Sequence, residues 1–346
     1  MGIARERWPR LDAMERGKRN LITDVAGVRV GHVTLKQGDV HTGVTAVLPH
    51  GGDVFHDKCP AAAHVINGFG KSVGLVQVQE MGAIETPLLL TNTLSVGAAH
   101  AGLVRYMLAR NADIGLETGT VNPVVLECND GALNDIRGMH ITQQHALEAL
   151  ENASEAFEEG AVGAGTGMTC YSLKGGIGSA SRVFTLYGEQ YTLGALLLTN
   201  FGSLGDLTLG GRLIGPRLHA LTQSEPRPDR GSAIAVLATD APLSHRQLLR
   251  AAKRAQSGIA RTGAISGNGS GEIALAFSTA NRAPHYPNGA PIPMRRLHDD
   301  DMDLVFRAVV ETVEESVISS LLHAEHTVGR AGTVRLCLGE LMERMQ

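Results

Sequence analysis

Short apolar runs interrupted by glycine and proline constrain this chain most strongly, because such runs are typical of strands that end in tight turns. They lie at 27–33, 44–48, 73–78, 88–90, 124–126, 191–198, 233–238, 273–278 and 333–338. Segments with helical periodicity separate some of them, at 94–109, 141–159, 243–261 and 303–323. Strands and helices come in blocks rather than in strict alternation, which predicts layered α+β packing with helices outside the sheets.

Two of the helices have recognisable starts. Ser244 and Gln247 form a capping-box pattern at the start of the third helix. The fourth reads as a long amphipathic helix with an acidic first turn. Residues 1–20 are charged throughout, so we expect a flexible arm, with the fold of a single domain, 1–346, beginning near residue 27.

Composition excludes several classes of protein. The net charge of −4 and the 4% aromatic content argue against a nucleic-acid surface. The four cysteines are far apart, which argues against zinc clusters and disulfide frameworks and favours buried thiols. The N-terminus lacks the apolar core of an export signal and no run approaches 18 apolar residues, so a cytoplasmic location is the default expectation.

The 42 glycines are about twice the usual share and cluster at 161–169, 174–179 and 266–271. Such loops allow close approach of backbone to backbone or to substrate, so they mark where a site is to be sought. The segment 68–72 resembles the end of a phosphate-binding loop but has Val65 where the first glycine is required, and 161–169 lacks dinucleotide-binding spacing. A structural glycine loop is the better interpretation of 161–169.

His323 and His326 are a possible metal pair, but no third ligand is evident and surface histidines are commoner there. We therefore expect no metal and no cofactor.

The segment 266–272 is the strongest chemical candidate. Taken alone it is usually a flexible turn, and Asn268 stands where a hydrolase nucleophile elbow needs glycine. A hydroxyl directly after Gly269, held in a strained turn, can however attack the preceding carbonyl and shift the acyl group from N to O. Hydrolysis then frees Ser270 as an N-terminus whose α-amine, with a pKa of about 8, serves as its general base.

The sequence as a whole resembles the DmpA/BapA family of L-aminopeptidase D-Ala-esterase/amidases and β-peptidyl aminopeptidases. The resemblance extends from Leu21 to about Leu338. Its carriers are NLITDVAGVRVGHVTL, HTGVTAVLP, NTLSVGAAHAGLVR, NPVVLECNDGALNDI, GAVGAGTGM, KGGIGSASR, LLLTNFG, GNGSGE, IALAFSTA and DDMDLVFRAVVETVEESVISSLL.

The resemblance implies a four-layer αββα sandwich like that of N-terminal nucleophile hydrolases, with different connectivity. It also implies self-cleavage into an α chain, 1–269, and a β chain, 270–346, with αβ units commonly assembled four together. By motif, Asn200 in LLLTNFG matches the side-chain donor to the oxyanion. Its structural alternative is a turn at a strand end.

Glu127 in PVVLECND matches the carboxylate that receives the substrate ammonium. The alternative for this residue is an ion pair with Arg137 or Arg182. Asn129 stands where the family usually has an aromatic residue, and it is expected to line the substrate pocket.

In the last long helix, Thr312 and Glu314 match a pattern that supports the nucleophile. Residues two apart do not share a helix face. The alternative is that Glu314 and Glu315 are ordinary surface charges.

Together these features predict a serine aminopeptidase. It would release N-terminal L-, D- or β-amino acyl groups from small peptides, amides and esters, with the oxyanion held by Asn200 and backbone amides near Gly271. An acyltransferase with the same chemistry and a non-catalytic glycine-rich binding protein are the alternatives.

Overall fold

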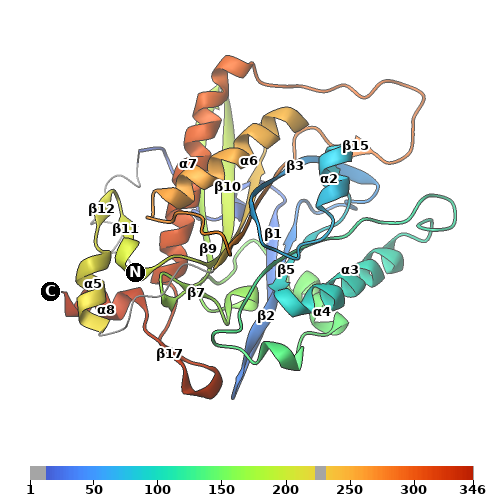
Figure 1. The fold of residues 1–346 in the computed structure, drawn as a ribbon. Coiled ribbons are helices and arrows are strands. Elements are labelled where there is room, and N and C mark those ends of the chain that lie inside the picture. Colours follow the sequence, from blue (N-terminus) through green and yellow to red (C-terminus); the bar gives the residue numbers. More distant parts are fainter. Residues whose placement is uncertain (1–12, 223–230, 346) are drawn as a thin grey trace.

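The computed structural model describes residues 13–222 and 231–345 (Figure 1). The smaller of its two main sheets has the strand order β1-β2-β5-β6, where the first two pairs are antiparallel and β5 and β6 are parallel. Its strands are β1 (Arg29–Gln37), β2 (Val40–Leu48), β5 (Leu88–Asn92) and β6 (Val124–Cys128).

The larger sheet has the order β15-β3-β14-β13-β10-β9, with β4 added beside β3. Within it only β13 and β14 pair in parallel. Its strands are β3 (Asp57–Gly68), β4 (Ala83–Ile84), β9 (Gly176–Leu186), β10 (Glu189–Asn200), β13 (Ser232–Thr239), β14 (Gly271–Ser278) and β15 (Ala283–Pro284).

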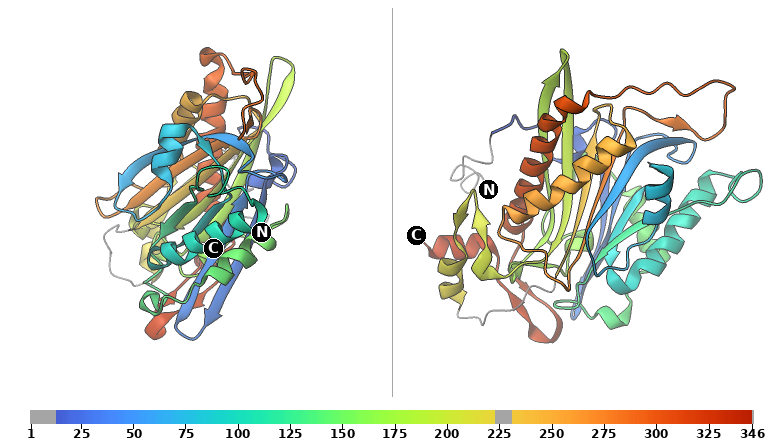
Figure 2. Two further views of the ribbon diagram at one scale, coloured as in Figure 1. Left: turned by 90° about the vertical axis from the view of Figure 1, so that its right-hand side faces the viewer. Right: turned by 45° about the horizontal axis from the view of Figure 1, so that its top comes forward.

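Four layers result, in the order helix, sheet, sheet, helix (Figure 2). Helices α6 (His245–Ala260) and α7 (Met302–Leu322) cover the outer face of the larger sheet, and α3 (Val96–Arg110) and α4 (Gln143–Glu151) cover that of the smaller one. Alternate residues of each strand face opposite sides. On β14, Ala274 and Ala276 join the core under α6 and α7, while Ile273, Leu275 and Phe277 join the core between the sheets.

The remaining elements are short. The helices are α2 (Leu75–Met81), α5 (Gly215–Thr222) and α8 (Leu338–Arg344), and the 3₁₀ turns are Ile22–Asp24, Thr93–Ser95, Ile136–Gly138, Gly163–Gly165, Leu204–Asp206, Asp299–Asp301 and Arg330–Gly332. Small hairpins are formed by β7 (Thr169–Cys170) with β8 (Leu173–Lys174), β11 (Thr208–Leu209) with β12 (Arg212–Leu213), and β16 (Thr327–Val328) with β17 (Val334–Arg335).

Most predicted elements are present, and Ser244 and Gln247 cap α6 as expected. Three predictions are wrong. The predicted strand 73–78 forms only a bridge at Val73 before it turns into α2, and 333–338 is a two-residue strand followed by α8. The helix predicted for 141–159 ends at Glu151, after which Ser154 forms a bridge to β1 instead.

Two long strands of the larger sheet, β3 and β9, were not predicted, because their small residues hide the strand pattern. Both lie against helices, and the small side chains allow close contact. A Cβ atom at Gly178 of β9 would lie 1.9 Å from the carbonyl oxygen of Ser316 in α7. Glycine is therefore required there for helix and sheet to meet.

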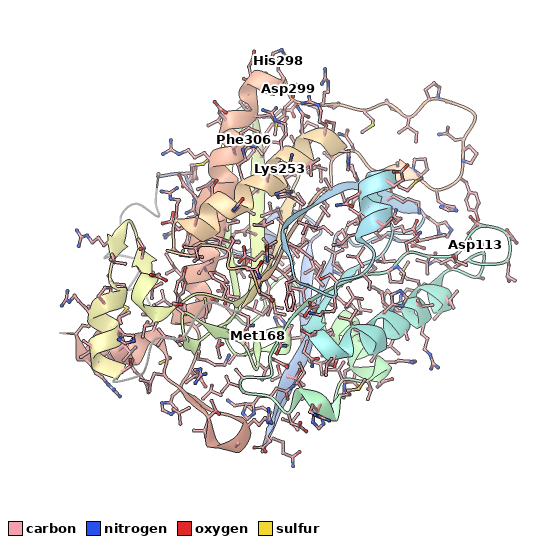
Figure 3. All side chains as sticks on the ribbon, viewed as in Figure 1. Asp113, Met168, Lys253, His298, Asp299 and Phe306 are labelled. Atoms are coloured by element: carbon pink, nitrogen blue, oxygen red, sulfur yellow. The ribbon has the colours of Figure 1, made fainter. Side chains whose placement is uncertain are left out.

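Helix α7 is buried along most of its length rather than amphipathic. Its first half carries Phe306, which lies beside α6 (Figure 3), where the guanidinium groups of Arg250 and Arg254 stack on its ring. From Glu311 to Leu321 every residue is buried.

The segment 13–20 is packed against the body of the protein, which corrects the expectation of a flexible arm for this part. The backbone N–H of Met14 donates to Glu311, that of Val183 donates to the carbonyl of Glu15, and that of Gly17 donates to Ser181. Residues 1–12 lie outside the described residues.

The cysteines are free and buried, as predicted. In the described ranges, no helix is both long and apolar enough to cross a membrane.

Candidate active site

Ser270 lies at the entrance to β14, in the middle of the larger sheet, and its side chain is fully buried. The turn before it is closed by the backbone N–H of Ser270, which donates to the carbonyl of Gly267 at 2.9 Å. Ser266 has a φ of 53°, in the left-handed region that residues other than glycine rarely adopt. The bond between Gly269 and Ser270 therefore belongs to a tight turn that directly follows a residue in an unfavourable backbone conformation.

Asn67, at the end of the neighbouring strand β3, contacts the backbone carbonyls of this turn. Its Nδ2 lies 3.3 Å from the carbonyl oxygen of Gly267 and 3.2 Å from that of Asn268, and it also donates to the carbonyl of Ser270. The backbone N–H of Phe69 donates to the same Ser270 carbonyl at 3.2 Å. The sequence had not identified Asn67 as a site residue, because nothing local shows that β3 pairs with β14.

The hydroxyl of Ser270 donates to Glu272 Oε1 at 2.7 Å, and that of Ser266 donates to Glu272 Oε2 at 2.5 Å. Ser270 and Glu272 are two residues apart where β14 begins, so their side chains share one face. Glu272 was also missed. The signal for it was present, since serine and glutamate at i and i+2 before an apolar run predict side chains on the same side of a strand.

Asn200 lies in the same row of the sheet as the residue after Ser270. Gly271 pairs with Ser232, and Ser232 pairs with Asn200. The backbones of Gly271 and Asn200 are therefore two strand spacings, about 10 Å, apart. The backbone N–H of Gly271 donates to the carbonyl of Gly231 at 3.3 Å.

The side chain of Asn200 is held at both ends and is 7% exposed. Its Oδ1 accepts from the backbone N–H of Thr169 at 3.0 Å, and its Nδ2 donates to the carbonyl of Asn129 at 2.9 Å. An amide nitrogen carries two hydrogens, so one is left for another acceptor. Asn129 is exposed, and its own Oδ1 accepts from the N–H of Gly131.

Glu127 ends β6 in the smaller sheet and is 3% exposed. Its Oε1 accepts from the backbone N–H of Lys71 at 2.8 Å, and its Oε2 accepts from the hydroxyl of Thr93. Glu127 makes these contacts and does not form the ion pair with Arg137 or Arg182 that was the alternative interpretation. Among the described residues no cationic side chain forms an ion pair with Glu127.

Gly70 lies between the carboxylate of Glu127 and the start of β14. A Cβ atom there would lie 3.4 Å from Glu127 Oε1 and 3.7 Å from the Cα of Gly271. Any side chain would thus enter the space between the carboxylate and the start of β14. The segment 68–72, which resembles a phosphate-binding loop, runs along this site instead.

Thr312 and Glu314 are buried in α7, so the surface alternative for Glu314 and Glu315 is wrong. The hydroxyl of Thr312 donates to the carbonyls of Ala308 and Val309 within the helix. Arg261 Nε lies 2.9 Å from Glu314 Oε2, at the point where α6 leads into the 261–270 loop. Glu314 therefore holds the base of that loop, while the hydrogen bonds of Ser270 go to other residues.

The loop 161–169 is structural, as predicted. Lys174 is fully buried, and its Nζ donates to the carbonyls of Gly165, Met168 and Gly175 at 2.6–2.9 Å. Burial lowers the pKa of Lys174 to about 7. Met168 lies near the end of the loop (Figure 3), next to Thr169, whose N–H holds Asn200. The loop thus fixes the orientation of the Asn200 amide.

His323 and His326 contact different acidic residues, Glu159 and Glu340. Among the described residues no cluster of three or more histidine, cysteine or acidic side chains is arranged to hold a metal ion.

The model of Peptidase family S58 matches residues 20–335. The chain belongs to peptidase family S58. Beta-peptidyl aminopeptidase BapA of Sphingosinicella microcystinivorans is 39% identical over 341 residues, which cover 91% of this chain and 84% of the relative.

Two solved structures extend the family comparison to the fold. The PH0078 protein of Pyrococcus horikoshii OT3 is 51% identical, with a TM-score of 0.91 over 96% of both chains. The L-aminopeptidase D-Ala-esterase/amidase of Ochrobactrum anthropi, a variant of the Ntn hydrolase fold, is 36% identical, with a TM-score of 0.89 over 96% of this chain and 94% of that one.

These matches confirm the resemblance seen in the sequence and the predicted αββα fold. The S58 chain is a hydrolase of the aminopeptidase class. This favours an enzyme over the non-catalytic binding protein considered from the sequence.

Proposed function

We propose that this S58 chain cleaves itself between Gly269 and Ser270 and that Ser270 then acts as the N-terminal nucleophile of the aminopeptidase. The observation that carries the proposal is the position of the Ser270 hydroxyl. It lies directly after a tight turn, at the start of a central strand that holds it in place. A fixed hydroxyl next to the peptide bond that it attacks is the arrangement that an N-to-O acyl shift requires.

After cleavage, Ser270 Oγ attacks the carbonyl carbon that follows the first residue of the substrate. The α-amine of Ser270 accepts the hydroxyl proton and later donates it to the leaving group. Water then hydrolyses the ester between the acyl group and Ser270. The free amine supplies both proton transfers, so no histidine is required.

Asn200 stabilises the tetrahedral intermediate through the second N–H of its amide. Its carbonyl end is fixed by the N–H of Thr169 and its other N–H by the carbonyl of Asn129. A donor that is already oriented costs no reorganisation when negative charge develops, and one such donor contributes about 3–4 kcal/mol.

Glu127 binds the ammonium group of the substrate, which restricts the enzyme to free amino termini. The carboxylate is buried and has hydroxyl and backbone donors around it. A buried charge without a counter-ion is costly, and a cationic substrate offsets that cost. Gly70 leaves room between this carboxylate and the start of β14. We propose small peptides, amides and esters of L-, D- or β-amino acids as substrates.

A comparison of two substrates on two proteins tests this function. We expect the wild-type enzyme to hydrolyse an aminoacyl anilide with a free amine and to leave its N-acetylated form intact, because acetylation removes the charge that Glu127 binds. The Ser270→Ala variant should hydrolyse neither. Hydrolysis of the acetylated substrate at an equal rate would contradict the role of the free amine, and an active Ser270→Ala variant would contradict the nucleophile.

A further inference from the structure

A cavity of about 430 Å³ lies at the end of the smaller sheet where β1 and β5 begin and β2 ends. Its walls come from the ends of β1 and β2, the loop 50–54, Pro87 and the last turns of α3. Glu127, in the proposed catalytic site, pairs with Thr91 near the other end of β5, about 13 Å along the strand from Pro87. The cavity is therefore separate from that site, and its volume is within the range of small-molecule sites.

Arg29 enters this cavity from the side of β1 that faces the helices. Its neighbour Val30 belongs to the core between the two sheets, and successive residues of a strand face opposite sides. Leu48, which pairs with Arg29 on β2, belongs to the core under α3 and α4. An arginine thus lies on a face of the sheet that is otherwise apolar.

The guanidinium of Arg29 has no counter-ion in the fold. Its Nε is buried without a hydrogen-bond partner, and none of the residues that the structure describes forms an ion pair with it. A partly buried cation without a partner costs free energy, and a bound anion would offset that cost.

Arg110, in the last turn of α3, brings a second guanidinium to the cavity. Its Cζ lies 3.6 Å from the centre of the Tyr106 ring, so stacking orients the planar group. Within residues 13–222 and 231–345, no acidic side chain forms an ion pair with Arg110. Two guanidinium groups without carboxylate partners at one cavity favour a carboxylate or a phosphate as ligand, because the N–H donors of arginine match such groups in geometry.

Among the described residues, Asp53 is the one acidic side chain at the cavity, and its charge is already compensated. Its Oδ2 lies 3.0 Å from Nδ1 of His56, outside the cavity lining. His50 orders the same loop, because its Nε2 donates to the carbonyl of Asp57 at 2.9 Å and its Nδ1 accepts from the N–H of Gly52 at 3.0 Å. This wall is therefore formed before a ligand binds, which lowers the cost of binding.

The remaining walls are largely apolar. Leu48, Val54 and Met107 line the cavity and are themselves buried in the fold. Pro87 adds a rigid apolar surface before β5. A ligand that matches these walls has an apolar part beside its anionic group, and a bare inorganic ion would leave much of the cavity unfilled.

We propose that this cavity binds a small organic anion. Arg29 and Arg110 hold its carboxylate or phosphate group, and its apolar part packs against Leu48, Val54 and Met107. The proposal goes beyond the aminopeptidase function and does not depend on it, since none of these residues belongs to the site around Ser270.

Isothermal titration calorimetry on the folded wild-type protein tests the site with defined probes. Phenyl phosphate and benzoate carry the two candidate anionic groups on one apolar ring, benzamide is the neutral analogue, and inorganic phosphate lacks the ring. Arg29→Met keeps an unbranched side chain without the charge, and Arg110→Ala removes the second guanidinium. The controls are Arg105→Ala, at an exposed arginine of α3 outside the cavity, and Lys71→Ala, at an exposed lysine next to Glu127.

We expect phenyl phosphate or benzoate to bind saturably with a Kd at or below about 1 mM, more tightly than inorganic phosphate, and benzamide not to saturate. The tighter of the two anions identifies the group that the site prefers. Arg29→Met should weaken binding about 10- to 100-fold, because a charged hydrogen bond is lost. Arg110→Ala should weaken it about threefold or more, since this side chain is exposed. Both controls should bind as the wild type does.

Thermal unfolding without probe establishes that each variant is folded, and Arg29→Met should unfold no earlier than the wild type because it loses no counter-ion. The proposal would be overturned if neither anion binds saturably up to about 10 mM, or if benzamide binds as tightly as the anions. It would also be overturned if a folded Arg29→Met chain binds within about twofold of the wild type. Loss of binding in Lys71→Ala with none in Arg29→Met would place the anion at the catalytic site instead.

Discussion

Two buried groups of carboxylates in this molecule differ in what surrounds them. On α7, Glu311 and Glu315 both pair with the fully buried Arg182, at 3.1 and 2.8 Å. At the start of β14, Glu272 is equally buried but is held by the hydroxyls of Ser266 and Ser270. Burial is therefore the same in the two groups, and only the partners differ.

The difference separates carboxylates that hold elements of the fold together from carboxylates that remain available for binding or chemistry. A buried carboxylate paired with a guanidinium has its charge compensated in the folded protein and holds elements together. A buried carboxylate whose hydrogen-bond partners are neutral hydroxyl and N–H groups has no counter-ion in these contacts and is available to a cationic ligand or a reacting group. Glu127 belongs with Glu272 in this respect, since its partners are a hydroxyl and a backbone N–H.

Removal of Arg182 should have the largest effect on stability. In an uncut Ser270→Ala chain, Arg182→Met removes the buried guanidinium that both glutamates contact, and leaves them with the more exposed Arg307 and Arg16. It should lower the free energy of unfolding by about 3–5 kcal/mol. The control is Arg307→Ala, because Arg307 also pairs with Glu311 but is 59% exposed. Its loss should be below about 1 kcal/mol. Equal losses in urea unfolding would break the distinction between buried and exposed pairs.

Removal of the Asn200 amide should come next, and it should affect rate rather than stability. We expect Asn200→Ala to lower kcat about 10²- to 10³-fold, because the oxyanion loses an oriented donor. Asn122→Ala, at an exposed asparagine that bonds to Glu85, is the control and should keep wild-type kcat. The measurement is steady-state kinetics on the cleaved enzymes. A normal kcat with a raised KM for Asn200→Ala would show that Asn200 binds the substrate and does not stabilise the oxyanion.

Glu127→Gln should mainly weaken substrate binding. The neutral amide keeps the shape of the carboxylate but loses its charge, which is worth about 1.5–3 kcal/mol in a hydrogen bond and corresponds to a rise in KM of roughly 10- to 100-fold. The same substitution at exposed Glu117 is the control. If a substrate without an amine suffers the same loss from Glu127→Gln, the ammonium is not what Glu127 binds.

The smallest effect is expected at an exposed acidic cluster. The hydrogen bond to Asp113 raises the pKa of His56, with a further contribution from Asp53. Asp113 lies on the loop after α3, at the edge of the molecule (Figure 3), and also binds the hydroxyl of Tyr286.

Because the pKa of His56 is raised in the folded state, its stabilising contribution is full below the unfolded pKa of about 6.5 and is lost as pH rises through the folded value. His56→Gln should therefore lower the thermal unfolding temperature at pH 6 and match the wild type at pH 9. A difference that is larger at pH 9 would contradict this sign.

The sequence predicts the layers and the nucleophile better than it predicts the surroundings of the nucleophile. Apolar runs identify β10, β13 and β14, and the turn before Ser270 stands out by its glycines. Strands β3 and β9 are hidden by small residues that are there to admit helices, as at Gly178. Because β3 was missed, Asn67 was missed as well.

The roles of individual glutamates depend on partners that are distant in the sequence. Glu315 meets Arg182 over 133 positions and Glu314 meets Arg261 over 53, so neither could be distinguished from a surface charge in advance. Glu272 is the opposite case, because its partner Ser270 is two residues away. Strand periodicity would have been sufficient to find it, although it was missed.

The most direct test of the account is the intact mass of the purified protein, measured under denaturing conditions with N-terminal sequencing. We expect two chains for the active wild-type enzyme, the smaller beginning at Ser270, and one full-length chain for Ser270→Ala. An active enzyme whose mass is that of the uncut chain would contradict it.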